Sequence, residues 1–100
     1  MYVTHPDKET AEKIVTHLLK TKRIACANLF PIESIYTWKG KKEQIKEIVS
    51  LLKTKEELWE ELKKEIENMH PYQTPCIIKI HADANPIFTA WIEKETKEKK

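Results

Sequence analysis

The stretch from Ile24 to Lys53, IACANLFPIESIYTWKGKKEQIKEIVSLLK, decides the fold. Two segments rich in β-branched and aromatic residues flank the dipeptide Lys39-Gly40, and Gly40 is the only glycine in the chain. A glycine in a two-residue connection between two such segments is typical of a tight β-hairpin turn. We therefore predict two long paired strands, over residues 24–38 and 41–53.

The segment before this hairpin predicts one strand and one helix. Residues 1–5, MYVTH, have the composition of a short strand. Residues 6–22 follow, and their apolar side chains recur at helical spacing from Ala11 to Leu19. Asp7 stands where a helix N-cap is expected.

The segment after the hairpin repeats this alternation. A helix is predicted over residues 54–69, with Thr54 and Glu57 forming a capping-box pattern. A short buried strand is predicted at CIIKIH, and a last helix is predicted to begin at Asn85-Pro86. The resulting order, βαββαβ plus a C-terminal helix, predicts an α+β, ferredoxin-like fold as a single domain over residues 1–100.

The predicted hairpin is longer than the helices that could cover it. Strands of about 13 to 15 residues span roughly 45 Å at 3.3 Å per residue, whereas helices of about 15 residues span roughly 23 Å. The outer part of the hairpin still carries apolar side chains: Ile32, Ile35, Tyr36, Trp38 and Ile45. An uncovered apolar ribbon promotes aggregation, so we predict that copies of the chain cover one another in a closed oligomer. Pro31, inside the first long strand, predicts a bulge or bend.

Composition narrows the class of protein. Charged residues make up 34% and hydrophobic residues 40% of the chain, which fits a soluble globular protein with no membrane-spanning segment. The net charge of +2 gives no reason to expect a nucleic-acid partner. Cys26 and Cys76 lie far apart, with neither zinc-finger nor disulfide-framework spacing, and no leader sequence is visible. We therefore expect a cytoplasmic protein, and the abundance of Lys and Glu is compatible with heat stability.

Catalytic motifs are absent from the sequence. It contains no GxSxG, no P-loop, no GxGxxG and no HExxH. An acylphosphatase-like site needs a glycine-bearing loop after the first strand, and THPDKE stands there instead. An RNA-binding sheet needs aromatic residues on the third strand, and IKEIVSLLK has none. We therefore expect a binding protein and not an enzyme.

The stretch ENMHPYQTPCI, residues 67–77, has two interpretations. In the first, His70 and Pro71 end the preceding helix, and the imidazole interacts favourably with the helix C-terminus. In the second, the Met69 thioether and the His70 imidazole offer a soft donor pair suited to copper, on a segment stiffened by two prolines. The residues themselves leave both interpretations open.

Three segments taken together resemble a known family. RIACANLFPIESIYTWKGK, EIVSLLKT and HPYQTPCI, in this order and spacing, resemble the CutA divalent-cation tolerance proteins. The resemblance covers nearly the whole chain. It implies a tight homotrimer of ferredoxin-like subunits with the long hairpins packed between them. Residues expected at this interface are Ile35, Tyr36, Trp38 and Ile45.

The resemblance also implies a metal-related function. It points to weak binding of copper or another divalent cation. From the residues themselves, His70 is the first candidate ligand, and Met69 ranks below it because Met69 belongs to the apolar stripe of its helix. The resemblance further implies clefts between subunits, like those of P-II signalling trimers. The cleft candidates are Cys26, Glu47, Lys53 and Tyr72. Some family members have cysteine at the position of Val3 and histidine at that of Met69, so we expect modest affinity. The alternative is a P-II-like module that binds a small ligand or a protein in these clefts.

Overall fold

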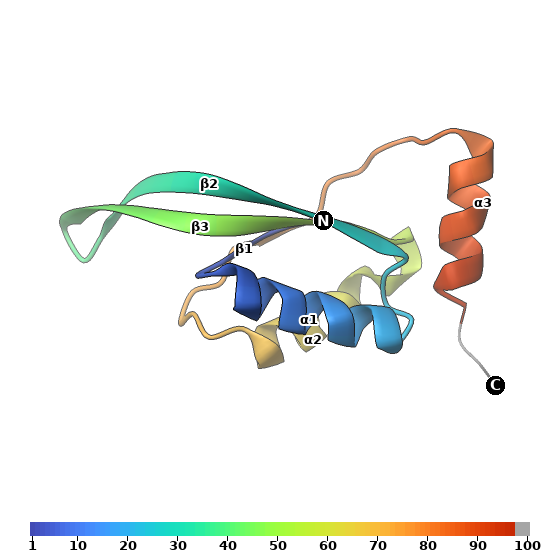
Figure 1. Cartoon of the computed structure of the whole chain (residues 1–100), viewed down its shortest axis with the longest axis horizontal. Helices are drawn as coiled ribbons and strands as arrows, with labels where there is room; N and C mark the ends of the chain where they lie inside the picture. The colour runs from blue at the N-terminus through green and yellow to red at the C-terminus, as the bar shows by residue number, and fades with distance from the viewer. Residues whose placement is uncertain (98–100) are drawn as a thin grey trace.

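The computed structural model of the chain describes residues 1–97. It contains one four-stranded antiparallel sheet with the strand order β2-β3-β1-β4. The elements in chain order are β1 (Tyr2–His5), α1 (Lys8–Lys20), β2 (Cys26–Trp38), β3 (Lys41–Lys53), the 3₁₀ turn η1 (Glu56–Leu58), α2 (Trp59–Met69), β4 (Ile77–Ile78) and α3 (Pro86–Glu95). Helices α1 and α2 lie side by side against one face of the sheet (Figure 1). The predicted α+β, ferredoxin-like plan is therefore confirmed.

The core lies between the sheet and these two helices. Helix α1 begins as predicted, because the Asp7 carboxylate accepts a hydrogen bond from the Thr10 backbone N–H at 2.7 Å. Its apolar stripe packs against that of α2 and against the inner face of the sheet. The core residues are Met1, Val3, Ile14, Leu18, Ile24, Leu52, Leu62 and Ile66.

The hairpin is regular from end to end. Its register runs unbroken from Cys26 opposite Lys53 to Trp38 opposite Lys41. Lys39 and Gly40 have φ values of 50° and 78°, the left-handed conformations that a tight hairpin turn requires. The bulge predicted at Pro31 is therefore wrong. β2 is an edge strand, where a proline breaks no ladder hydrogen bond if its nitrogen faces the open side.

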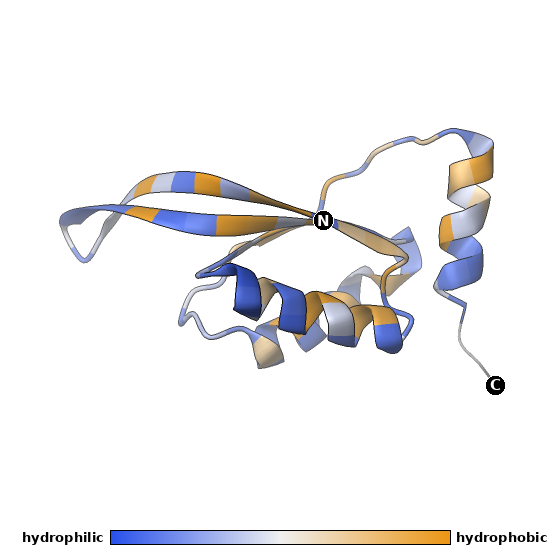
Figure 2. Ribbon diagram, viewed as in Figure 1, coloured by the Kyte–Doolittle hydropathy of each residue, from blue (hydrophilic) through white to orange (hydrophobic). Residues whose placement is uncertain are grey.

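The hairpin extends well past the helices (Figure 1), as its length predicted. Figure 2 shows hydrophobic and hydrophilic residues alternating along both strands out into this projecting part. Ile35 is 61% exposed, and Tyr36 and Trp38 are also exposed, whereas Ile32 and Ile45 are half-buried. The projecting part thus has apolar side chains with no cover from its own subunit.

The start of α2 differs from the prediction. The capping box is wrong, because the Thr54 hydroxyl donates to the Arg23 carbonyl at 2.7 Å and caps no helix. The chain instead enters through η1, and α2 begins at Trp59 without a side-chain cap. The Thr54 hydroxyl, which the local sequence predicted as the helix cap, instead forms a tertiary hydrogen bond with the segment before β2.

The C-terminal segment also differs from the prediction. The strand expected at CIIKIH contains only Ile77 and Ile78, which pair with Val3 and Tyr2, and the predicted burial is wrong because Ile78 is 48% exposed. Residues 79–97, here called the C-terminal arm, run away from the sheet and into α3 (Figure 1). Helix α3 begins at Asn85-Pro86 as predicted, but it buries none of its residues, and Ile87 is 83% exposed.

No helix within residues 1–97 is both long and apolar enough to cross a membrane.

Candidate functional site

His70 ends helix α2. Its backbone leaves the helical conformation, with φ −78° and ψ 135°, while its N–H still donates to the Ile66 carbonyl at 2.8 Å. Pro71 follows and has no N–H to continue the helix. The helix-stop interpretation therefore describes the backbone here, and the chain turns back toward β1 and β3.

Both ring nitrogens of His70 have partners within the chain. Nε2 donates to the Thr4 carbonyl at 2.6 Å, so the proton of the neutral ring lies on Nε2. Nδ1 then carries the lone pair, and it accepts from the Tyr72 backbone N–H at 3.2 Å. The residue is 8% exposed. A metal ion could reach this imidazole only at Nδ1, by displacing the Tyr72 amide.

His5 lies beside His70 and is fully buried. The two rings stack with centroids 5.4 Å apart, and His5 Nε2 hydrogen-bonds with the Ser50 hydroxyl at 2.8 Å. Burial, and then the neighbouring His70, lower the pKa of His5 to about 4. Sequence reasoning treated His5 only as a strand-end residue. The signal was the alternation of side chains along a strand: His5 is two residues after Val3 and therefore lies on the same, buried face.

Tyr72 links this histidine pair to a buried carboxylate. Its ring centroid lies 4.8 Å from that of His70, and its hydroxyl donates to Glu47 Oε2 at 2.6 Å. Burial, and then the hydrogen bond to Glu47, raise the pKa of Tyr72. The phenol therefore stays protonated and the carboxylate accepts. Glu47 itself is only 6% exposed.

The predicted site residues form two separate groups. Glu47 and Tyr72 lie together beside His70. Cys26 and Lys53 face each other at the opposite end of the hairpin, where Lys53 Nζ lies 3.8 Å from Cys26 Sγ and donates to Asn28 Oδ1. The two groups share the hairpin but not a site within one subunit.

No metal site is complete within residues 1–97. These residues contain no group of three or more His, Cys, Asp or Glu side chains placed to hold a metal ion. Met69 packs against the hydrophobic core, so its thioether is directed inward and away from the surface. Any metal site in this region therefore needs ligands from outside the single subunit, or a local rearrangement.

A groove of about 680 Å³ opens next to Glu47 and Tyr72. Two cross-strand pairs, Ser34–Ile45 and Tyr36–Glu43, form part of its wall. Successive side chains of a strand point to opposite faces, and the core residue Leu52 is an odd number of positions from Glu43 and Ile45 on β3. The groove is therefore on the sheet face opposite α1 and α2. Its aromatic and acidic lining residues are Tyr2, Tyr36, Trp38, Tyr72, Glu43 and Glu47.

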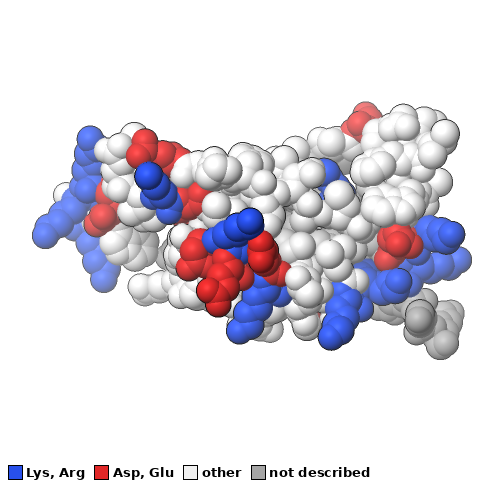
Figure 3. All heavy atoms as spheres, in the orientation of Figure 1, with Lys and Arg blue, Asp and Glu red and all other residues white. Residues whose placement is uncertain are grey.

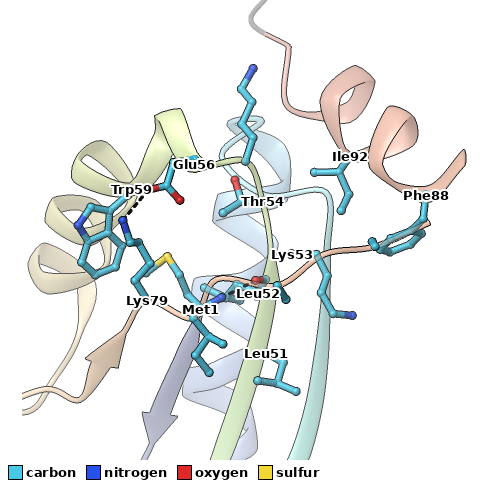
Figure 4. A pocket seen from close by; sticks show the side chains of 14 residues that line it. Met1, Leu51, Leu52, Lys53, Thr54, Glu56, Trp59, Lys79, Phe88 and Ile92 are labelled. Atoms are coloured by element: carbon cyan, nitrogen blue, oxygen red, sulfur yellow. Dashed lines mark hydrogen bonds and ion pairs between the residues drawn. The ribbon is translucent and has the colours of Figure 1, made fainter. Parts of the chain in front are cut away.

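A second, smaller cavity of about 290 Å³ lies between the end of β3, the start of α2 and the C-terminal arm (Figure 4). Lys79 Nζ contacts Glu56 Oε1 at 2.6 Å and lies 5.7 Å from the centroid of the Trp59 ring. Phe88 and Ile92 of α3 line the opposite side. The ion pair neutralises Lys79, but Lys53 and Lys55 also line this cavity, so its lining is basic where that of the groove is acidic.

The lysines of the hairpin end are separate from both cavities. Lys39, Lys41 and Lys42 are exposed, and basic side chains gather at this end of the molecule (Figure 3).

Comparison with known proteins gives a consistent result. The family model described as CutA1 divalent ion tolerance protein matches residues 1–95. The divalent-cation tolerance protein CutA of Pyrococcus horikoshii is 50% identical over 98 residues, which cover 97% of this chain and 96% of that protein. The structure described as the periplasmic divalent cation tolerance protein CutA from Archaeoglobus fulgidus has a TM-score of 0.94 at 39% identity, covering 96% of this chain and 95% of that one. The PII-like protein CutA from Nostoc sp. PCC 7120 has a TM-score of 0.90 at 30% identity, covering 96% and 94%.

Proposed function

The chain belongs to the CutA1 divalent ion tolerance protein family, and on this premise we propose that it contributes to divalent-cation tolerance by binding Cu²⁺ or another divalent cation as a homotrimer. The observation that carries the proposal is the family match over residues 1–95. The proposed role is binding and not catalysis. We also propose a cytoplasmic location, supported by the unpaired thiols of Cys26 and Cys76, although the Archaeoglobus relative is described as periplasmic.

Three surfaces of the single subunit support the trimer. The outer edge of β2 has no strand partner within residues 1–97, although this strand is 13 residues long. The projecting half of the hairpin exposes Tyr36 and Trp38, and the C-terminal arm exposes Ile80 and Ile87. Open edges and apolar patches of this kind are usually covered by a partner. Light scattering at micromolar concentration is expected to report three subunits, and a monomer would contradict the proposal.

Heat stability follows from the trimer. Association stabilises the folded state by mass action, so the unfolding midpoint is expected to rise with protein concentration. We expect the midpoint to lie above about 60 °C. Calorimetric scans at several concentrations check both points, and a midpoint independent of concentration would count against association.

His70 is the proposed imidazole ligand. Its Nε2–H donates to the Thr4 carbonyl, and metal-binding histidines usually donate their second ring N–H in this way. Its Nδ1 lone pair is held by the Tyr72 amide at 3.2 Å, a bond that the metal must replace. That competition predicts modest affinity, with the remaining ligands supplied across a subunit boundary.

Copper titration by calorimetry tests this assignment. His70→Ala is expected to weaken binding by about tenfold or more, a size typical of lost ligand interactions. The matched control is His81→Ala. His81 is exposed, with Nε2 4.0 Å from Asp83 Oδ1, so this variant measures how much copper binds adventitiously to an exposed histidine. If His81→Ala loses the copper and His70→Ala retains it, the site lies on the C-terminal arm.

The groove favours a second candidate function, a P-II-like role in small-ligand binding. At about 680 Å³ it lies within the range of roughly 300 to 1,000 Å³ found for small-molecule sites. Titration with a panel of small metabolites, in the absence of added metal, tests this role separately from copper binding.

A further inference from the structure

Glu47 is a buried carboxylate with no counter-ion among the described residues. Within residues 1–97 its one hydrogen-bond donor is the Tyr72 hydroxyl, and no lysine, arginine or histidine forms an ion pair with it. A carboxylate that is 6% exposed loses most of its hydration, and one neutral donor compensates only part of that cost. This arrangement favours a cation next to Glu47 that residues 1–97 do not provide.

The groove beside Glu47 matches such a cation. Its lining contains no lysine or arginine among the described residues, and it contains a second carboxylate, Glu43. Four aromatic side chains form its walls: Tyr2, Tyr36, Trp38 and Tyr72. The faces of Trp and Tyr rings attract organic cations through their negative π-clouds, an arrangement used to recognise ammonium groups.

We propose that this groove binds a small organic ammonium cation, with the aromatic walls around its charged head and Glu47 as its counter-ion. This inference rests on the second candidate function, the small-ligand role, and is independent of copper. A bare metal ion fits less well, because residues 1–97 bring no three metal-ligating groups together here. The proposed trimer would place a neighbouring copy against Tyr36 and Trp38, closing the mouth of the groove.

A pair of probes with the same shape and different charge tests the proposal. Choline carries a quaternary ammonium group, and 3,3-dimethyl-1-butanol is its neutral carbon isostere. Calorimetry on the intact oligomer is expected to show choline binding about tenfold or more tighter than the neutral probe. Equal affinities for the two probes, or no choline binding at millimolar concentration, would overturn the proposal.

Matched variants locate the site. Glu47→Gln keeps the size of the side chain and removes its charge, so the preference for choline is expected to disappear. The control is Glu33→Gln on the same hairpin, because alternation directs Glu33 to the opposite face from groove residue Ser34. Its choline affinity is expected to match that of the unmodified protein. If Glu47→Gln does not fold, Glu43→Gln is expected to give a smaller loss of the same preference.

Two further outcomes would show that something other than an ammonium cation occupies the groove. If Glu47→Gln abolishes binding of Cu²⁺ alone and leaves choline binding unchanged, the groove is a metal site. If choline does not bind and Glu47→Gln dissociates the oligomer, a side chain of the neighbouring copy supplies the cation. Either result overturns the ammonium assignment, and only the first bears on the copper proposal.

Discussion

The inner and outer halves of the hairpin have the same sequence pattern and opposite surroundings. Both alternate apolar and polar side chains along paired strands. On the sheet face that α1 and α2 cover, Leu52 in the inner half is buried, whereas Ile35 in the outer half is 61% exposed. The difference arises because α1 and α2 are shorter than the strands. The inner half therefore stabilises the subunit, and the outer half is left to stabilise an assembly.

The largest expected effect is on assembly through the outer half. Trp38→Asp places a charge in the proposed interface, which costs about 3 to 5 kcal/mol when the charge is desolvated and unpaired. Light scattering is expected to show dissociation at concentrations where the unmodified protein is a trimer. Thr37→Asp is the control, since it adds the same charge one residue away on the other face of β2. Equal dissociation by both variants would reject Trp38 as a specific interface residue.

The complementary change is in the inner half. Leu52→Ala removes a side chain that is 3% exposed and part of the core, so it is expected to lower the free energy of unfolding by about 3 kcal/mol. Ile35→Ala removes an exposed side chain from the outer half and is expected to cost the subunit less than about 0.5 kcal/mol. Denaturant unfolding at low concentration, where assembly contributes least, measures both. Similar losses would mean that the two halves do not have different roles.

The histidine pair predicts a pH dependence of intermediate size. The pKa of His5 in the folded state is about 4, below the ordinary value of 6.5, so the unfolded chain binds a proton that the folded chain does not. The resulting stability is fully present above about pH 6.5 and is lost as the pH falls toward about 4. His5→Gln, which does not titrate, is expected to flatten this part of the stability curve. His81→Ala, which removes an exposed histidine, is expected to leave the slope unchanged.

The smallest expected effect is at the hydrogen bond between Tyr72 and Glu47. Tyr72→Phe removes the hydroxyl and leaves the buried carboxylate without its donor, which is expected to cost about 1.5 to 3 kcal/mol at neutral pH. Denaturant unfolding of Tyr72→Phe beside the unmodified protein measures this. An unchanged unfolding free energy at neutral pH would show that water replaces the hydroxyl.

The sequence by itself determined the elements whose signals are local. The turn at Lys39-Gly40, the length of the hairpin, the Asp7 cap and the stop at His70-Pro71 all depend on residues within a few positions of one another. Each of these was predicted from periodicity, capping or turn chemistry. The projection of the hairpin past the helices was also predicted, because it depends only on the lengths of the strands and helices.

Only the tertiary structure decided which distant groups meet. His70 bonds to Thr4 across 66 positions, Tyr72 to Glu47 across 25, and Thr54 to Arg23 across 31. The last of these removed the predicted capping box, and the predicted strand at CIIKIH pairs with β1 through only two residues. The family resemblance named Cys26, Lys53, Glu47 and Tyr72 as candidates for clefts between subunits, and only the structure shows that one subunit holds the first two apart from the last two. Periodicity records which side of an element a residue faces, but the partner on that side depends on how the whole chain packs.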